Sequence, residues 1–165
     1  MTASFDATPL QSKVMTVKED WLDYNGHLNM AYYNVLFDTA LDEALERLRL
    51  GADYLKTRNA SYFTAEAHVC YLRELGSGMP VTGTVQLVDF DAKRAHFYQE
   101  LHHAEEGWLS ATSEQLSLHV DMGARKVCPW PEDILSNLTA LFKAQSSLPR
   151  PERAGRKIEI RKKPA

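Results

Sequence analysis

The sequence has no long hydrophobic run, few cysteines and little net charge, and each of these absences excludes a class of protein. No segment approaches the roughly 18 consecutive apolar residues that a membrane-spanning helix needs. The formal net charge of −3 is too small to indicate a nucleic-acid-binding surface. The two cysteines, Cys70 and Cys128, form neither a disulfide framework nor a metal-binding motif. We therefore expect a protein of a reducing compartment that binds neither membrane nor nucleic acid.

The length of the chain favours one globular domain with a short extension at each end. A chain of 165 residues can bury a core of its own, and it contains no internal repeat. Residues 1–12 are polar and do not resemble a signal peptide, so a flexible N-terminal arm and a cytoplasmic location are expected. Residues 13–145 are expected to form the domain. Residues 146–165 are rich in proline, arginine and lysine and are expected to form a basic, mobile tail.

A change of hydrophobic period marks the start of one long helix. From Asn29 onward, acidic residues gather on one side and apolar residues recur on the other at steps of three and four. This pattern predicts an amphipathic helix that Asn29 caps and Gly51 ends. The apolar positions are Tyr33, Phe37, Ala40, Ala44 and Leu48.

The rest of the chain alternates mainly with a period of two, which is typical of strands. Residues 13–18 predict a short strand before the helix, and four longer strands are expected after it, over 63–71, 81–88, 94–102 and 109–120. A weaker helical pattern follows at 134–142. Short turns indicate antiparallel pairing, and the apolar face of such a sheet must be covered. The sequence therefore predicts an α+β fold, an antiparallel sheet wrapped around one long central helix. Its exposed sheet edges favour a homodimer, or a tetramer built from dimers.

The segment Asp23-Tyr24-Asn25-Gly26-His27 lies directly before this helix and carries polar side chains suited to catalysis. Backbone N–H groups that open a helix are unpaired and can hold a developing oxyanion, a contribution of roughly 3 kcal/mol per donor in hydrolases. A nearby carboxylate or imidazole can then attack a carbonyl or activate water. Asp, Asn and Gly also form turns, so a simple turn before a helix cap is the alternative interpretation.

The run D-Y-N-G-H-L-N-M-A-Y-Y resembles the start of the central helix in hotdog-fold thioesterases. In the 4-hydroxybenzoyl-CoA thioesterase-like group, an Asp three residues before a Gly is the catalytic carboxylate, and Asp23 and Gly26 match that spacing. The resemblance implies that the backbone N–H groups near Asn29 and Met30 polarise the thioester carbonyl. Plant acyl-carrier-protein thioesterases carry a similar string, whose active-site Asp, Asn and His are matched by Asp23, Asn25 and His27.

The segment 71–76 resembles the strand end that supplies a catalytic Glu followed by Cys in the same plant enzymes. Glu74 matches the Glu, whereas Leu75 stands at the position of the Cys. The resemblance therefore favours the Asp-based mechanism over a cysteine nucleophile. It implies catalytic roles for Asp23, Asn25, His27 and Glu74. No cofactor is expected, because coenzyme A is part of the substrate. No metal is expected either, because His96, His102 and His103 lack the carboxylate or cysteine spacing of a metal site.

Four further runs are similar to the betainyl-CoA thioesterases of bacterial carnitine breakdown: W-L-D-Y-N-G-H-L-N, F-T-A-E-A-H-V-C-Y-L, F-D-A-K-R-A-H and S-E-Q-L-S-L-H-V-D. This resemblance implies hydrolysis of a small acyl-CoA, with betainyl-CoA giving glycine betaine and free CoA. A trimethylammonium group is held on aromatic faces by cation–π attraction. Tyr33 and Phe63 are expected to face the core, which leaves four candidate substrate-binding residues: Trp21, Tyr24, Tyr32 and Tyr62.

Two other functions remain open from the sequence. The first is an enoyl-CoA hydratase-type hotdog enzyme, although the separate Asp/His dyad that hydratases usually carry is not found. The second is a module that binds acyl-CoA without hydrolysing it. The basic tail carries groups that can bind CoA phosphates, but a solvated tail is the simpler interpretation.

Overall fold

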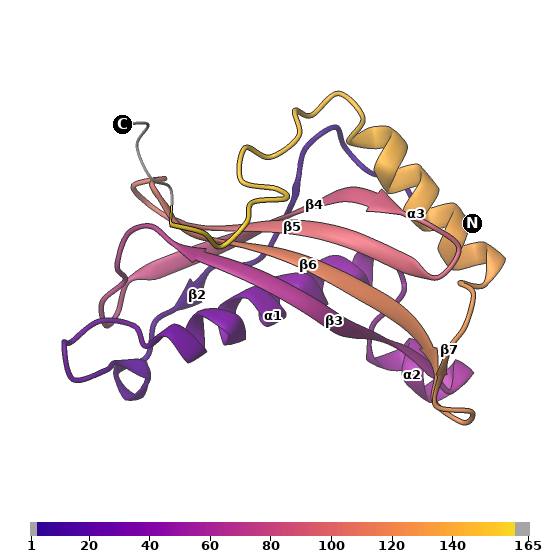
Figure 1. The fold of residues 1–165 in the computed structure, drawn as a ribbon, viewed down its shortest axis with the longest axis horizontal. Coiled ribbons are helices and arrows are strands. Elements are labelled where there is room, and N and C mark those ends of the chain that lie inside the picture. The colour runs from indigo at the N-terminus through magenta and orange to yellow at the C-terminus, as the bar shows by residue number, and fades with distance from the viewer. Residues whose placement is uncertain (1–2, 161–165) are drawn as a thin grey trace.

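The computed structural model describes residues 3–160, which form a sheet curved around one long helix, α1 (Met30–Arg47) (Figure 1). Neighbouring strands of the sheet follow the order β1-β4-β5-β6-β3, while β2 pairs with β4 and β7 with β6. All of these pairings are antiparallel. The strands are β1 (Leu10–Gln11), β2 (Met15–Thr16), β3 (Ala60–Tyr71), β4 (Pro80–Phe90), β5 (Arg94–His103), β6 (Leu109–Asp121) and β7 (Lys126–Val127). The predicted α+β architecture is confirmed.

Helix α1 forms where the apolar period predicts it. The Asn29 side chain accepts a hydrogen bond from the Ala31 N–H at 3.0 Å, so it caps the helix as expected. The end of the helix differs from the prediction, because Arg49 takes the left-handed conformation (φ 64°) there and Gly51 instead precedes a second helix. The buried side of α1 consists of Tyr33, Leu36, Phe37, Ala40, Leu41, Ala44 and Leu45.

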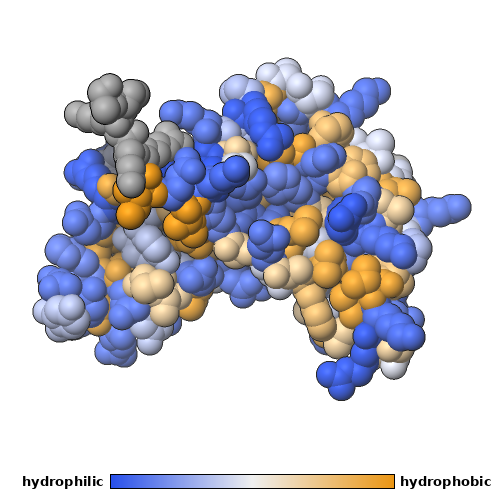
Figure 2. Space-filling model, in the orientation of Figure 1, coloured by the Kyte–Doolittle hydropathy of each residue, from blue (hydrophilic) through white to orange (hydrophobic). Residues whose placement is uncertain are grey.

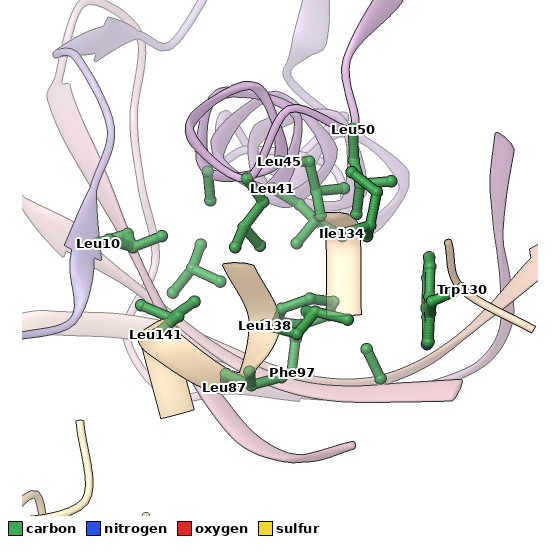
Figure 3. Packing of buried hydrophobic residues seen from close by; sticks show 14 of the residues in the cluster. Leu10, Leu41, Leu45, Leu50, Leu87, Phe97, Trp130, Ile134, Leu138 and Leu141 are labelled. Atoms are coloured by element: carbon green, nitrogen blue, oxygen red, sulfur yellow. The ribbon is translucent and has the colours of Figure 1, made fainter. Parts of the chain in front are cut away.

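Two apolar clusters hold α1 against the sheet. The larger one lies at the C-terminal half of α1, where α3 (Glu132–Ala144) closes the edge of the core with Leu138 and Leu141 (Figure 3). The smaller one lies at the N-terminal half and includes Leu28, Phe37 and Leu75. Leu28 and Leu75 flank the predicted site in the sequence, so this second cluster fixes both of its segments to the same core.

One edge of β3, the first long strand, is exposed. Strand β3 pairs with β6 from Ala60↔Asp121 to Tyr71↔Ala111, with a bulge between Thr64 and Glu66. No other strand within residues 3–160 pairs with the far side of β3, which is therefore an edge. Its middle, residues 63–67, is exposed to solvent.

Several boundaries differ from the prediction. Leu10 and Gln11 lie in the expected arm, yet they pair with Val85 and Thr84 of β4, and Leu10 is only 3% exposed. Of the expected strand 13–18, only Met15–Thr16 forms ladder pairs. Burial of Leu10 explains the difference, because a single apolar side chain in a polar segment gives no periodic signal.

Two short helices are absent from the prediction. They are a 3₁₀ turn, η1 (Glu19–Trp21), and α2 (Ala52–Arg58). Helix α2 buries only Tyr54, so its seven residues carry too little of an apolar stripe to be recognised. None of the helices within residues 3–160 is long and apolar enough to span a membrane.

The segment after α3 crosses the face of the sheet opposite α1 (Figure 1). The Gly155 N–H donates to the Glu114 carboxylate of β6, with N–O distances of 2.7 and 2.9 Å. Three basic residues of the predicted tail, Arg161, Lys162 and Lys163, lie outside the described residues.

Candidate active site

The loop before α1 is closed by its own backbone. Leu22 and Leu28 form an antiparallel bridge, the Asp23 N–H donates to the His27 carbonyl at 2.8 Å, and the Gly26 N–H donates to the Asp23 carbonyl at 3.0 Å. Gly26 has a φ of +78°, a conformation that a glycine adopts without strain. The predicted turn is therefore present, and it sets the direction of the polar side chains.

Asp23 has a structural contact and a free oxygen. Its Oδ1 accepts the N–H groups of Asn25 at 2.8 Å and His27 at 3.4 Å. Its Oδ2 has no hydrogen bond within residues 3–160, and the side chain is half-buried. The turn interpretation and the catalytic interpretation are thus compatible, because one oxygen holds the loop and the other is available to a substrate.

A groove of about 360 Å³ lies beside this carboxylate. We call it the Asp23 groove. One wall comes from the loop and the start of α1, and the other comes from the end of β3 and the residues after it. Its lining consists of Asp23, Asn25, His27, Leu28, Met30, Tyr33, Tyr71, Leu72, Arg73 and Glu74. The four residues predicted to be catalytic share this groove, although 46 positions or more separate Glu74 from the others in sequence.

Only one of the two predicted backbone donors is available. The Asn29 N–H donates to the Trp21 carbonyl at 2.9 Å, so the prediction that it holds the substrate oxygen is wrong. Met30 is the first residue of α1, where an N–H has no acceptor within the helix. No hydrogen bond of the Met30 N–H occurs in the described part of the chain, and Met30 lines the groove. Of the two predicted donors, Met30 is therefore the one whose N–H is free among the described residues.

Two tyrosines form part of the groove wall. The rings of Tyr33 and Tyr71 meet edge to face with centroids 5.0 Å apart, and the Tyr71 hydroxyl donates to the Met30 carbonyl at 3.3 Å. Burial raises the pKa of both phenols above the usual 10.0, so both are neutral at physiological pH. Tyr33 is 4% exposed, which agrees with its predicted place in the core, although one side of it also borders the groove.

The predicted aromatic residues do not form a cage at this groove. Trp21 and Tyr32 stack on each other, with centroids 5.5 Å apart and an interplanar angle of 12°. The Lys18 ammonium already lies 5.0 Å from the centroid of the Trp21 ring. Tyr24 is 98% exposed. None of these three aromatic residues lines the Asp23 groove, so their role in substrate binding stays a prediction.

The fourth aromatic candidate lines a second groove, of about 600 Å³, between α1 and the start of β3. We call it the Tyr62 groove. The Tyr62 hydroxyl donates to the Asp42 carboxylate, and burial together with Asp42 raises the pKa of Asp38. Phe63 also lines it and is 50% exposed, so the expectation that Phe63 faces the core is wrong. Three carboxylates spaced four residues apart on α1 make the groove acidic: Asp38, Asp42 and Glu46.

Comparison with known proteins identifies the family. The sequence model of the thioesterase-like superfamily matches residues 17–138. The chain belongs to this superfamily. A betainyl-CoA thioesterase of Pseudomonas aeruginosa is 35% identical to it over 154 residues, which cover 90% of this chain and 97% of that protein. An L-carnitine dehydrogenase/betainyl-CoA thioesterase of Rhizobium meliloti is 35% identical over 156 residues, 94% of this chain, but the chain spans only 31% of that longer relative.

Two solved structures share the fold. A hypothetical protein of Staphylococcus aureus in complex with CoA superposes with a TM-score of 0.85 at 27% identity, covering 98% of each chain. A putative thioesterase of Pseudomonas putida superposes with a TM-score of 0.80 at 36% identity, covering 93% of this chain and 98% of that one. The predictions of a hotdog fold and of a thioester hydrolase are thereby confirmed.

Among the lining residues to which the sequence analysis gave no role, Tyr71 and Arg73 carry polar groups. Tyr71 alternates with the other apolar residues of its strand, so nothing in the pattern distinguishes it from a core residue. Arg73 is an isolated charge at a strand end, and its only signal is its position beside Glu74. Both belong to the groove because β3 ends next to the first turn of α1, which is a tertiary contact.

Proposed function

We propose that this thioesterase hydrolyses a small acyl-CoA and that Asp23 supplies the attacking or activating carboxylate. The observation that supports this is the shared groove, which Asp23 and Met30 line from one side and Glu74 from the other. The reaction needs no cofactor, because CoA leaves as the thiol product. We place it in the cytoplasm, where free thiols such as Cys70 and Cys128 persist.

The groove suggests a role for each group. The thioester oxygen accepts a hydrogen bond from Met30 N–H, which stabilises the negative charge that develops as the carbonyl carbon is attacked. Asp23 either attacks that carbon, giving a mixed anhydride that water then hydrolyses to the free acid, or takes a proton from a water that attacks the carbon directly. Asn25, His27 and Glu74 orient water and substrate. When the carbon–sulfur bond breaks, the CoA sulfur leaves as a thiolate and takes up a proton.

Betainyl-CoA is the acyl-CoA that we propose as substrate. Two relatives at 35% identity are named for this activity. A trimethylammonium group carries a charge but no N–H, so it is held by carboxylates at a distance and by aromatic faces. The Tyr62 groove offers both, since Asp38 and Asp42 face Tyr62 and Phe63 across it.

We further propose a homodimer in which two copies of β3 pair antiparallel. The edge of β3 has unpaired backbone groups, which tend to recruit another strand. Figure 2 shows the outline of the molecule indented between the lobe of the 19–29 loop and the lobe of α2, which leaves this edge accessible. Strand β3 runs from the Tyr62 groove to the Asp23 groove. Antiparallel pairing therefore brings the Tyr62 groove of one subunit next to the Asp23 groove of the other.

Release of free thiol tests the proposed function. The wild type and Asp23→Asn are assayed on betainyl-CoA, acetyl-CoA and an aromatic acyl-CoA. The amide oxygen of Asn can still accept the loop N–H groups, so the fold is kept while the charge is lost. We expect the wild type to prefer betainyl-CoA and Asp23→Asn to lose activity by at least about 100-fold, the usual contribution of a positioned acid or base.

Asp20→Asn is the matched control, because Asp20 lies in η1 close to the loop but does not line the groove. Undiminished turnover in Asp23→Asn would contradict the role of Asp23. Binding of CoA esters without thiol release would instead identify a non-catalytic module. Preference for the aromatic acyl group would contradict the betainyl assignment and leave the thioesterase assignment standing.

A further inference from the structure

Arg73 lies at the Asp23 groove with its guanidinium group held on an aromatic ring. Its Cζ lies 3.9 Å from the centroid of the Trp108 ring, a close cation–π contact. Trp108 is itself fixed on its other sides. Its indole N–H donates to the Glu106 carboxylate at 2.8 Å, and its ring stacks on His103 at 5.1 Å. The guanidinium group therefore rests on a rigid platform.

The backbone of Arg73 is equally well fixed. Its N–H donates to the Ser110 carbonyl at 3.0 Å, and the Ser110 hydroxyl donates to the Arg73 carbonyl at 2.7 Å. Ser110 is fully buried in β6. Because both ends of the side chain are held, little conformational entropy remains to be lost when the guanidinium group binds a ligand.

This guanidinium group has no carboxylate partner within residues 3–160. Arg58 and Arg94, by contrast, form ion pairs with Asp133 and Asp91. Two carboxylates line the same groove as Arg73, yet neither forms an ion pair or a hydrogen bond with it. An arginine that served to neutralise Asp23 or Glu74 would contact one of them. Five preorganised N–H donors at the edge of a binding groove are instead suited to an oxyanion from solution.

We propose that Arg73 binds an anionic group of the thioester substrate at the rim of the Asp23 groove. This inference rests on the proposed function and adds a binding residue to it. Two parts of an acyl-CoA present that chemistry: the phosphates of CoA and a carboxylate at the far end of an acyl chain. Arg73 is a binding residue in this proposal, so its loss raises KM rather than lowering kcat.

Four substrates separate the two sources of negative charge. Acetyl and succinyl groups are each presented on CoA and on N-acetylcysteamine, a carrier that keeps the thioester and lacks the phosphates. Arg73→Gln removes the charge, and Arg73→Lys keeps it without the planar donor set. We expect Arg73→Gln to raise KM about tenfold for the substrates that carry the anion, which is the loss expected from one charge-assisted hydrogen bond. Arg73→Lys is expected to restore part of this lost affinity.

Arg47→Gln is the matched control, because Arg47 is an exposed arginine in the last turn of α1, about 25 Å from the groove at 1.5 Å per residue. A rise in KM confined to the CoA esters assigns the anion to the phosphates. A rise confined to the succinyl esters assigns it to an acyl carboxylate. An equal rise on all four substrates, or on none, overturns the proposal.

A binding measurement keeps this test independent of catalysis. Titration calorimetry with free CoA and with pantetheine, which lacks the phosphates, is run on the wild type and on Arg73→Gln. Loss of thioesterase activity in every form of the protein would refute the proposed function, while a weaker Kd for CoA in Arg73→Gln would still support the anion contact. Unchanged denaturation midpoints show that the variants are folded.

Discussion

At the scale of single residues, a missing side chain determines how closely α1 approaches the sheet. Gly83 lies in β4 directly beneath Ala40 of α1, and a Cβ atom at this position would collide with the Ala40 methyl group. The Gly83 N–H also donates to the Ser12 hydroxyl at 2.9 Å, which attaches the segment before β2 to the same point. Both contacts depend on a short distance between helix and strand.

Replacement of Gly83 by alanine tests this contact. We expect Gly83→Ala to lower the free energy of unfolding by about 1–3 kcal/mol, as overpacking in a close-packed core does. Urea denaturation followed by circular dichroism measures the change. Gly76→Ala is the control, because its Cβ would meet only the Met79 side chain at an ordinary 3.6 Å. Equal effects of the two substitutions would show that α1 can move away from the sheet at little cost.

The site residues show how much of a site a local sequence motif can predict. Asp23, Asn25, His27 and Glu74 were predicted from their resemblance to thioesterase motifs, and they share one groove. Asn29 was assigned an oxyanion role that its hydrogen bond to Trp21 excludes. A sequence motif shows which residues lie near a helix start. The hydrogen-bond acceptor of each backbone N–H depends on the path of the chain that precedes the helix.

At the scale of elements, the first turn of α1 connects stability with chemistry. The Asn29 side chain caps the helix through the Ala31 N–H, and the next residue, Met30, carries the N–H proposed to hold the oxyanion. Any fraying of this turn changes the direction of that N–H. A helix cap is therefore also a support of the active site.

Removal of the cap tests this link. We expect Asn29→Ala to destabilise the protein by about 1 kcal/mol and to lower kcat in the thiol-release assay, while Asn29→Asp retains both properties because Asp also caps. Asn34→Ala is the matched control on the exposed side of the same helix. A normal kcat in Asn29→Ala would separate the cap from catalysis.

The elements themselves were predictable to different degrees. Helix α1 and strands β4, β5 and β6 have buried faces over ten or more residues, so their periods are clear in the sequence. β1, β2 and α2 are two to seven residues long, and each carries at most one buried side chain. Such short elements are stabilised by their contacts with the sheet or the core. Their own residues give no periodic signal.

At the scale of the whole molecule, the exposed edge of β3 is where we propose that two copies of the chain pair. One Lys on this edge places a charge where the proposed dimer pairs its strands. We expect Ala67→Lys to convert the dimer to a monomer in analytical ultracentrifugation, because residue 67 lies midway along β3 between the two grooves, near the two-fold axis, where two charges would meet. Val14→Lys is the control, since Val14 is 61% exposed and lies between β1 and β2, which pair with β4 on the other side of the sheet from β3. A wild type that sediments as a monomer would contradict the dimer directly.

The sequence by itself determined the architecture and the family, because both depend on local order: the period of a strand or helix, and the spacing of polar residues before α1. The tertiary structure decided which distant segments of the chain lie together. It brought residues 23–30 and 71–74 into one groove, left the Met30 N–H free while using that of Asn29, and separated Tyr62 from Trp21 and Tyr32. It also placed Arg73 on Trp108. These arrangements follow from the pairing of β3 with β6 and from the packing of α1, which are long-range contacts that no local pattern encodes.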